Sequence, residues 1–462
     1  MILWTSPEAA QATGGRNTAP WQASGVSIDT RSLQPGDLFV ALEDARDGHD
    51  FVAEAFGKGA AAAMVSRVPP NLPAQAPLLL VTDVLQALAD LGKAARARTR
   101  ARIVGITGSV GKTSTKEMLC AVLSRQGRTH ASQSSHNNHW GVPLTLARLP
   151  ADADFAVVEI GMNHPGEIAP LARMARPHVA IVTTVAHAHL EAFASIEAIA
   201  QEKAAIFEGL ESGGTAIVNA DVATAFILRA KAHAAGRTVS FGACEDADWR
   251  LINARVCEGT TVARAAHRGQ EMAFALASPG RHFAFNALAA LAAVDALGAD
   301  AAKAATDLDL WQPPPGRGQR LRIPLDPAHG TFFDVLDDAF NANPAAMAAA
   351  LDVLAATHPV GETGRRIAIL GDMLELGPEE AALHTAIAGH PSLAMVDAVH
   401  CIGPRMKALH DVLPQRQQGI WVPAADDIVP RLRSLVGPGD VVLVKGSKST
   451  KLRTVVDALR LG

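Results

Sequence analysis

The stretch Gly105-Ile106-Thr107-Gly108-Ser109-Val110-Gly111-Lys112-Thr113-Ser114 joins an apolar run at residues 102–106 to a helical segment that begins near Thr113. Gly108 and Gly111 permit a tight turn that brings backbone N–H groups against phosphate oxygens, and the following helix N-terminus adds partial positive charge. Lys112 would neutralise the terminal phosphates, and the Thr113 hydroxyl would hold Mg²⁺. The alternative is an ordinary glycine turn beside a solvated lysine. Because strand, turn and helix follow in the required order, we predict a phosphate-binding loop, although Ile106 replaces the first glycine of G-x-x-x-x-G-K-[ST].

Length and composition restrict the class of protein. A chain of 462 residues is long enough for two or three domains, and a net charge of −4 offers no basic surface for nucleic acid. The first fifteen residues lack the basic segment of a signal peptide, and no run reaches the ~18 apolar residues of a membrane span. The cysteines lie far apart without metal-binding spacing, at positions 120, 244, 257 and 401. We expect a cytoplasmic protein without nucleic-acid binding or membrane insertion.

Residues 101–311 alternate apolar runs with helical stretches, as parallel α/β units do. Further strands are predicted at 155–160, 179–184 and 215–219. Glu159 lies at the end of the first of these runs, and His187 and His189 follow the second. A lone Glu or His is commonly a hydrogen-bonded core residue, but two strand ends that face one phosphate loop indicate a magnesium and phosphate site. The loop that holds Asn137 and Asn138 either contacts substrate or only turns the chain.

Two further units flank this region. The first hundred residues contain short apolar runs at 38–42 and 60–65 among turn-forming clusters, which predicts a small α/β domain. Its triplet Asp29-Thr30-Arg31 is either an anion contact or a solvated turn. After a proline-rich hinge at 313–317, strands predicted at 332–336, 367–370, 398–402 and 441–444 form a doubly wound pattern. It lacks the G-x-G-x-x-G fingerprint, so we expect no nicotinamide cofactor.

The predicted fold class is therefore α/β with three domains. A small N-terminal α/β domain covers residues 1–98, a central P-loop domain with a parallel sheet covers 99–318, and a Rossmann-like domain covers 319–462. Polar segments follow the strands of the third domain, and three such segments at successive strand ends indicate a binding face.

Lys203 is unusual in its helix. In the helix predicted to start near Ser195, Ile196, Ile199, Lys203 and Ile206 fall on one apolar stripe. A lysine at such a position either extends its ammonium to solvent or has a function. Because the helix directly follows the strand end at His189, a functional role for Lys203 is favoured.

Together these motifs resemble the Mur ligases, ATP-dependent enzymes that form amide bonds in peptidoglycan precursor synthesis, over essentially the whole chain. The phosphate-binding loop of that family has the pattern T-G-x-x-G-K-[ST], which residues 107–113 satisfy; we call this segment the cradle. The runs Asp-Asp-Ala-Phe-Asn-Ala-Asn-Pro and Leu-Gly-Asp-Met-Leu-Glu-Leu-Gly in the third domain are similar to those of the family member that adds a dipeptide. The resemblance implies ATP and Mg²⁺ as cofactors, UDP-N-acetylmuramoyl-tripeptide and D-alanyl-D-alanine as substrates, and a monomer.

The resemblance also assigns roles to individual residues. It implies Lys112, Glu159, His189 and Lys203 as catalytic residues, and Thr113, Glu159, His189 and Lys203 around metal, with Lys203 carbamylated. The implied nucleotide contacts are Gly108, Ser109, Val110, Gly111, Lys112, Thr113, Ser114, His282, Asn286, Arg317 and Asp338. The implied substrate contacts are Asp29, Thr30, Arg31, Asn137, Asn138, Asn341, Asn343, Lys445 and Ser447. The chain departs from the family pattern at Val110, at Phe340, where tyrosine is common, and at Lys448, where arginine is usual.

Two alternatives remain open. Another ligase of the superfamily, such as a folylpolyglutamate synthase, would share the cradle and Lys203 but would not need the first domain. A nucleotide-binding regulator would keep the ATP site without ligation.

Overall fold

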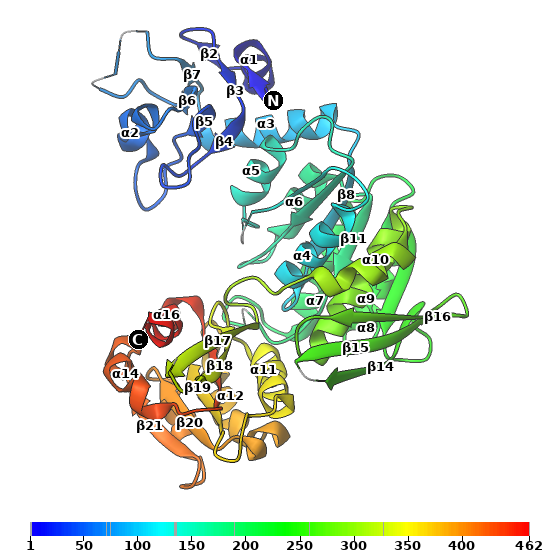
Figure 1. Ribbon diagram of the computed structural model, residues 1–462. Helices are drawn as coiled ribbons and strands as arrows, with labels where there is room; N and C mark the ends of the chain where they lie inside the picture. The colour runs from blue at the N-terminus through cyan, green and yellow to red at the C-terminus, as the bar shows by residue number, and fades with distance from the viewer. Residues whose placement is uncertain are drawn as a thin grey trace.

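The computed structural model describes residues 2–70, 72–73, 75–133, 136–188, 190–257, 259–326 and 328–461. Three α/β units follow one another along the chain, and Figure 1 shows the central unit between the other two. Among the described residues, no helix combines the length and the apolar character needed to cross a bilayer. The predicted α/β class with parallel sheets is confirmed.

The central unit is built on a long sheet in which the strands predicted at 155–160, 179–184 and 215–219 run parallel to the strand before the cradle, as expected. From one edge to the other, the strands are β16 (Gln270–Leu276), β15 (Thr260–His267), β14 (Trp249–Cys257), β13 (Arg237–Gly242), β12 (Thr215–Asn219), β11 (Val179–Val182), β8 (Arg102–Thr107), β10 (Phe155–Glu159) and β9 (Thr129–Ala131). Only the β14–β15 and β15–β16 pairs are antiparallel within this sheet as described. The strands between 237 and 276 were not predicted. In β15 and β16, small and half-exposed residues carry a weak apolar signal.

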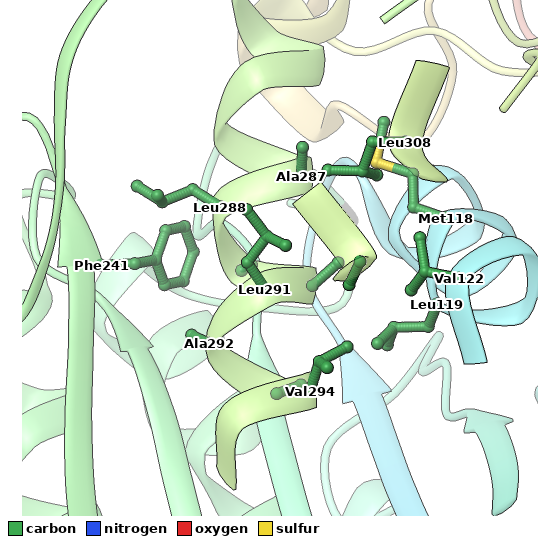
Figure 2. Close-up of a cluster of buried hydrophobic side chains, with 14 of the residues drawn as sticks. Met118, Leu119, Val122, Phe241, Ala287, Leu288, Leu291, Ala292, Val294 and Leu308 are labelled. Atoms are coloured by element: carbon green, nitrogen blue, oxygen red, sulfur yellow. The ribbon is translucent and has the colours of Figure 1, made fainter. Parts of the chain in front are cut away.

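Helices cover both faces of this sheet. They are α4 (Lys112–Leu123), α5 (Gly141–Ala147), α6 (Ile168–Ala175), α7 (Ile196–Ala204), α8 (Ala225–Ala235), α9 (Arg281–Ala296) and α10 (Ala301–Asp307). Figure 2 shows side chains of α9, such as Leu288 and Leu291, in one buried cluster with Met118 and Val122 of α4 and Phe241 of β13. Since burial of each large apolar side chain contributes roughly 1.5–3 kcal/mol, this cluster holds the N-terminus of α9 rigidly beside the cradle.

The N-terminal unit has a smaller sheet with parallel inner strands. The order is β2 (Arg16–Asn17), β7 (Leu78–Leu80), β6 (Ala62–Val65), β5 (Asp37–Val40) and β4 (Gly25–Ser27), accompanied by the ribbon of β1 (Trp4–Thr5) and β3 (Gln22–Ala23) and by α1 (Ser6–Thr13), α2 (Val52–Gly57) and α3 (Val84–Arg98). Its core also takes in Leu144 and Ala147 of α5, and Trp4 Nε1 donates a hydrogen bond to the Ala147 carbonyl at 2.8 Å. The first two units therefore share a core.

The C-terminal unit is the predicted doubly wound sheet. Its strand order is β17 (Gln319–Asp326), β18 (Thr331–Asp338), β22 (Val441–Lys445), β19 (Arg366–Gly371), β20 (Ala398–Ile402) and β21 (Gln418–Val422), with helices α11 (Pro344–Ala356), α12 (Glu380–Ala386), α13 (Lys407–His410), α14 (Ala425–Ile428), α15 (Leu432–Leu435) and α16 (Arg453–Leu461). Apart from the β17–β18 pair, the described strand pairs of this sheet are parallel.

We propose domain boundaries after residues 98 and 318. The helix α3 ends at Arg98, residues 99–101 separate it from β8, and β17 begins at Gln319. Residues 311–318 form no helix or strand between the last helical turn of the central unit and β17.

Candidate active site

Cavities lie at the two joints between the units. One, the N-terminal cavity, has a volume of about 710 Å³ and is lined by residues of the first two units. Three others are lined by residues of the central and C-terminal units, and Ser109 lines all three. The cradle cavity, of about 150 Å³, contains Lys112, Thr113 and Glu159, and the hinge cavity, of about 70 Å³, contains His282, Asn286 and Arg317. The C-terminal cavity, of about 480 Å³, contains Asn341, Lys448 and Lys451. The carboxyl ends of β8, β10, β18 and β22 meet around these three, as expected for α/β sheets.

The cradle has the backbone that its glycines predict. Gly108 and Gly111 have φ values of +153° and +90°, and a Cβ at these positions would collide with Thr183 Oγ1 and Asn286 Oδ1, respectively. Ser109 is held in place because its Oγ accepts a hydrogen bond from the Ala186 N–H at 3.0 Å. Only glycine fits at the two turning positions, so the tight turn depends on both.

Lys112 is the first residue of α4, and its Nζ donates a hydrogen bond to the Gly108 carbonyl at 2.6 Å. Burial lowers the pKa of Lys112, while the nearby Glu159 carboxylate opposes this shift. The ammonium lies against the cradle backbone at the N-terminus of a helix. This is where a bound phosphate would meet both the lysine and the helix N–H groups.

Glu159 and Thr113 lie together, as the magnesium prediction requires. The Thr113 hydroxyl donates to Glu159 Oε2 at 3.1 Å, and Asn137 Nδ2 donates to Glu159 Oε1 at 2.8 Å. Glu159 is only 1% exposed, although a carboxylate at this depth needs a cationic or hydrogen-bonding partner. A carboxylate and a hydroxyl are the oxygen ligands that suit Mg²⁺. His189, which was also predicted for this metal site, lies outside the described residues.

Lys203 is buried in α7, with 2% of its surface exposed. Burial lowers the pKa of Lys203 well below its usual value, and repulsion from Lys112 lowers it further. The two lysines are therefore close enough for their charges to interact. The predicted position on the apolar side of the helix is confirmed, and the ammonium does not reach solvent.

The hinge cavity gathers the four residues expected to contact the nucleotide outside the cradle. His282 and Asn286 come from the first turns of α9, Arg317 from the linker and Asp338 from the end of β18. Burial lowers the pKa of His282 to about 4, with a further contribution from Lys445, so the imidazole is neutral at pH 7. The Arg317 guanidinium lies 4.0 Å above the Phe340 ring, a cation–π contact.

Lys445 belongs to this hinge cavity rather than to the C-terminal cavity. Its Nζ contacts Asp338 Oδ2 at 2.6 Å and the Asn341 carbonyl at 3.0 Å, and the residue is 1% exposed. We expected Lys445 among the substrate contacts. In this arrangement its ammonium instead holds Asp338, a residue expected at the nucleotide.

Asn341, Asn343 and Ser447 do line the C-terminal cavity. Asn343 Oδ1 accepts from the Ala346 N–H at 2.9 Å and so caps α11, while Ser447 Oγ accepts from the Leu374 N–H at 3.0 Å. Both side chains thus stabilise the cavity wall. The same wall includes Lys448 and Lys451, and only Lys448 stood out in the sequence, as a departure from the family pattern.

The triplet Asp29-Thr30-Arg31 lines the N-terminal cavity. Arg31 Nη2 pairs with Asp29 Oδ2 at 2.6 Å, and this bonding lowers the pKa of Asp29 to about 2. Arg148 and Trp140, which line this cavity from the central unit, carry no signal in the sequence that predicts such a position.

The loop at 136–140 separates the N-terminal cavity from the cradle cavity. His136, His139 and Trp140 line the N-terminal cavity, whereas Asn137 and Asn138 line the cradle cavity. A ligand that extends from one joint to the other would pass this loop, so the predicted contacts at Asn137 and Asn138 are placed along such a path.

A phosphate cradle with a carboxylate at the neighbouring strand end, set between α/β units, defines a P-loop nucleotide-binding protein. Three family models match the chain: the Mur ligase family catalytic domain at residues 22–96, the Mur ligase middle domain at 106–294 and the Mur ligase glutamate ligase domain at 324–448. The chain is 37% identical over 452 residues to UDP-N-acetylmuramoyl-tripeptide--D-alanyl-D-alanine ligase of Escherichia coli, covering 94% of this chain and 93% of that protein. It belongs to the Mur ligase family.

Solved structures agree with the three-domain architecture. A crystal structure of MurF from Acinetobacter baumannii is 28% identical, with a TM-score of 0.84 and coverage of 99% of both chains. MurF ligase from Thermotoga maritima in complex with ADP is 27% identical, with a TM-score of 0.78, and covers 94% of this chain and 97% of its own. The predicted three-domain fold class and the resemblance to the Mur ligases are thus confirmed.

Proposed function

We propose that this chain is an ATP-dependent ligase that joins D-alanyl-D-alanine to UDP-N-acetylmuramoyl-tripeptide in peptidoglycan precursor synthesis. The observation that carries the proposal is the match over nearly the whole chain to ligases named for this reaction, at 37% identity for the Escherichia coli enzyme. The convergence of Lys112, Thr113 and Glu159 at one cavity supports it, because these groups suit phosphoryl transfer.

The reaction has a simple chemical requirement. A carboxylate is a poor acyl donor until one of its oxygens becomes a good leaving group. Transfer of the γ-phosphoryl group of ATP to the terminal carboxylate of the peptide gives an acyl phosphate and releases ADP. The amine of the dipeptide then attacks the acyl carbon and loses a proton, an amide bond forms, and phosphate leaves with the bonding electrons of the broken C–O bond.

The residues of the cradle stabilise the charge that moves in this reaction. Lys112 places its ammonium where the phosphoryl oxygens gather charge, and the backbone N–H groups that begin α4 add to it. Thr113 and Glu159, with His189 and a carbamylated Lys203, would hold Mg²⁺. When bound, the ion supplies charge compensation to the phosphates.

We assign the three substrates to the four cavities at the joints. The hinge and cradle cavities together take the adenine nucleotide, the N-terminal cavity takes the uridine diphosphate end of the peptide substrate, and the C-terminal cavity takes the dipeptide. Movement about residues 313–317 would bring the domains together and exclude water from the acyl phosphate. We further propose that the protein works as a monomer in the cytoplasm, where ATP is available.

The test is release of inorganic phosphate by the purified protein with ATP and Mg²⁺. We expect release only when both a UDP-N-acetylmuramoyl-tripeptide and D-alanyl-D-alanine are present, and a product whose mass equals their sum minus water. A panel of peptides with diaminopimelate or lysine at the third position would define the donor. Phosphate release with a folate and glutamate would instead identify the superfamily alternative, and nucleotide binding without any release would identify a regulator.

A further inference from the structure

We propose that Lys448 and Lys451 jointly bind the terminal carboxylate of the incoming dipeptide, and that they make a free carboxyl terminus a requirement for the acceptor. The inference rests on the proposed function and concerns a feature of this chain in particular. Two lysines on one turn can do what an arginine fork does, since two ammonium groups can each contact one carboxylate oxygen.

The C-terminal cavity has two walls of different origin. Ser109, Lys112 and Ala188 come from the central unit, whereas Lys448, Ser449 and Lys451 come from the turn that follows β22. The cavity is therefore lined by the ammonium of Lys112 from the cradle and by a second group of cations from the C-terminal unit. An acceptor with an amine at one end and an anion at the other matches such a space.

The other cation at this strand end is already paired. Lys445 contacts Asp338 and the Asn341 carbonyl and lines the hinge cavity instead. Within the part of the chain that the structure describes, neither Lys448 nor Lys451 forms an ion pair, and both are exposed to the cavity and solvent. Lys448 Nζ lies 5.7 Å from the centre of the Phe340 ring, which limits its directions without neutralising its charge.

The backbone of this turn is strained at the second lysine. Lys451 follows the 3₁₀ turn η8 (Lys448–Thr450) with φ +56° and ψ +28°, and its N–H donates to the Lys448 carbonyl at 3.2 Å. The left-handed region is costly for a residue with a Cβ, by about 1 kcal/mol or more, and such residues gather at functional sites. The turn brings both lysines to one wall of the cavity.

A second strained residue lines the same cavity. Among the described residues, the non-glycine positions with positive φ are Arg176, Arg268, Glu375 and Lys451, and the last two both line the C-terminal cavity. Glu375 comes from the loop after β19 rather than from the turn after β22. Two separate loops thus adopt an unfavourable conformation around one space, which points to a shape retained for a ligand.

The chemistry of the acceptor fixes its direction. Its amine must reach the acyl carbon, next to the phosphoryl group that Lys112 contacts. An extended dipeptide spans about 7 Å at 3.3–3.6 Å per residue, so its carboxylate points away from the cradle. The cations that it meets on the opposite wall are those of Lys448 and Lys451. An uncharged terminus, or a further residue attached to it, would lose this contact.

The experiment compares D-alanyl-D-alanine with D-alanyl-D-alaninamide as acceptors in steady-state assays of the wild type, Lys448→Gln, Lys451→Gln and the double variant. For the wild type, we expect the KM of the amide to exceed that of the free acid by about tenfold to a hundredfold, the range for a charged hydrogen bond. Each single variant should raise the KM of the free acid about tenfold and leave that of the amide unchanged. In the double variant the two KM values should become similar.

A matched control is Lys231→Gln, since Lys231 is an exposed lysine of α8, away from these cavities. We expect it to change neither KM. An equal loss for acid and amide in Lys451→Gln would assign the residue to folding of the turn and overturn the inference. A rise in the KM of ATP instead would show that these lysines bind phosphate. Equal use of both acceptors by the wild type overturns the inference alone, whereas absence of product with either acceptor overturns the proposed function as well.

Discussion

Buried charges mark the site at the scale of single residues. Glu159, Lys203 and Lys445 are each 1% to 2% exposed, although a buried charge is costly unless it is paired. Glu159 is satisfied by Thr113 and Asn137, and Lys445 by Asp338. Burial of Lys203 among apolar groups favours its neutral amine. Ionisable groups buried together in this way are typical of a functional site.

Lys112→Ala should abolish turnover and leave the fold intact. Its ammonium acts on charge that develops at the phosphates, and loss of one such contact costs about 3 kcal/mol or more, roughly a hundredfold to a thousandfold in kcat. Phosphate-release kinetics measure the loss, and the thermal unfolding temperature serves as the control for folding. Near-normal turnover in the variant would remove Lys112 from the mechanism.

Lys203 is predicted to be carbamylated in the active enzyme. A lowered pKa makes a neutral amine available for reaction with CO₂, and the product is an anion with two oxygens, which suits Mg²⁺. Lys203→Ala should lose at least about a hundredfold in kcat, as for loss of another charge-stabilising group. A short carboxylic acid added to the assay should restore part of this activity.

The matched variant is Lys203→Gln, which keeps a polar, slightly shorter side chain without the charge or the carbamate. A glutamine that retained most of the wild-type rate at saturating Mg²⁺ would contradict the carbamate and leave Lys203 a packing role.

At the scale of elements, helices position the site by what their apolar faces pack against. The helix α9 is held in the cluster of Figure 2, so Asn286 is fixed beside Gly111, and His282 lines the same hinge cavity. The contact of α3 with α5 joins the N-terminal unit to the central unit in the same way. A Cβ at Gly92 of α3 would lie 3.0 Å from the Pro143 carbonyl oxygen and 3.3 Å from Leu146 Cβ.

Gly92→Leu should therefore separate α3 from α5. We expect a loss of about 1–3 kcal/mol in the free energy of unfolding, as for other overpacked sites, and a higher KM for the UDP-linked peptide with the KM of ATP unchanged. Denaturant unfolding and steady-state kinetics test both effects. Gly57→Leu is the control, because a Cβ at Gly57 meets nothing within 4 Å. Unchanged stability of Gly92→Leu would mean that the contact between α3 and α5 accommodates the larger side chain.

At the scale of the whole molecule, the site is divided between domains. The hinge cavity takes His282 and Asn286 from the central unit, Arg317 from the linker, and Asp338 and Lys445 from the C-terminal unit. A nucleotide bound there would contact both domains and connect them. Its binding energy then contributes to the stability of the assembled protein.

A non-hydrolysable ATP analogue should therefore raise the unfolding temperature of the intact protein. At a hundred times its Kd, a ligand adds about 2.7 kcal/mol to the free energy of unfolding. Arg317→Gln should weaken binding of the analogue about tenfold or more and reduce the increase in unfolding temperature at a given concentration, since a charged contact is lost. The control is Arg433→Gln, an exposed arginine of α15. An equal increase in all three proteins would exclude Arg317 from the nucleotide site.

Several features followed from the sequence alone, because they depend on neighbours in the chain. The cradle needs glycine at positions 108 and 111, and the strand before it and the helix after it are local. The apolar side of α7 likewise indicated that Lys203 lies on the face of its helix that packs inward, and the residue is buried. Periodicity also indicated the parallel sheets of the central and C-terminal units.

Other features were decided only by tertiary structure, since they bring together residues far apart in the chain. Nothing in the sequence around Lys445 shows that its ammonium meets Asp338, and nothing around α5 shows that Leu144 completes the core of the first domain. The strained turn at Lys451 and its place opposite Lys112 also depend on how two domains pack. Local patterns determine which groups are available for chemistry, whereas long-range packing determines which of them are already paired and which remain to bind a substrate.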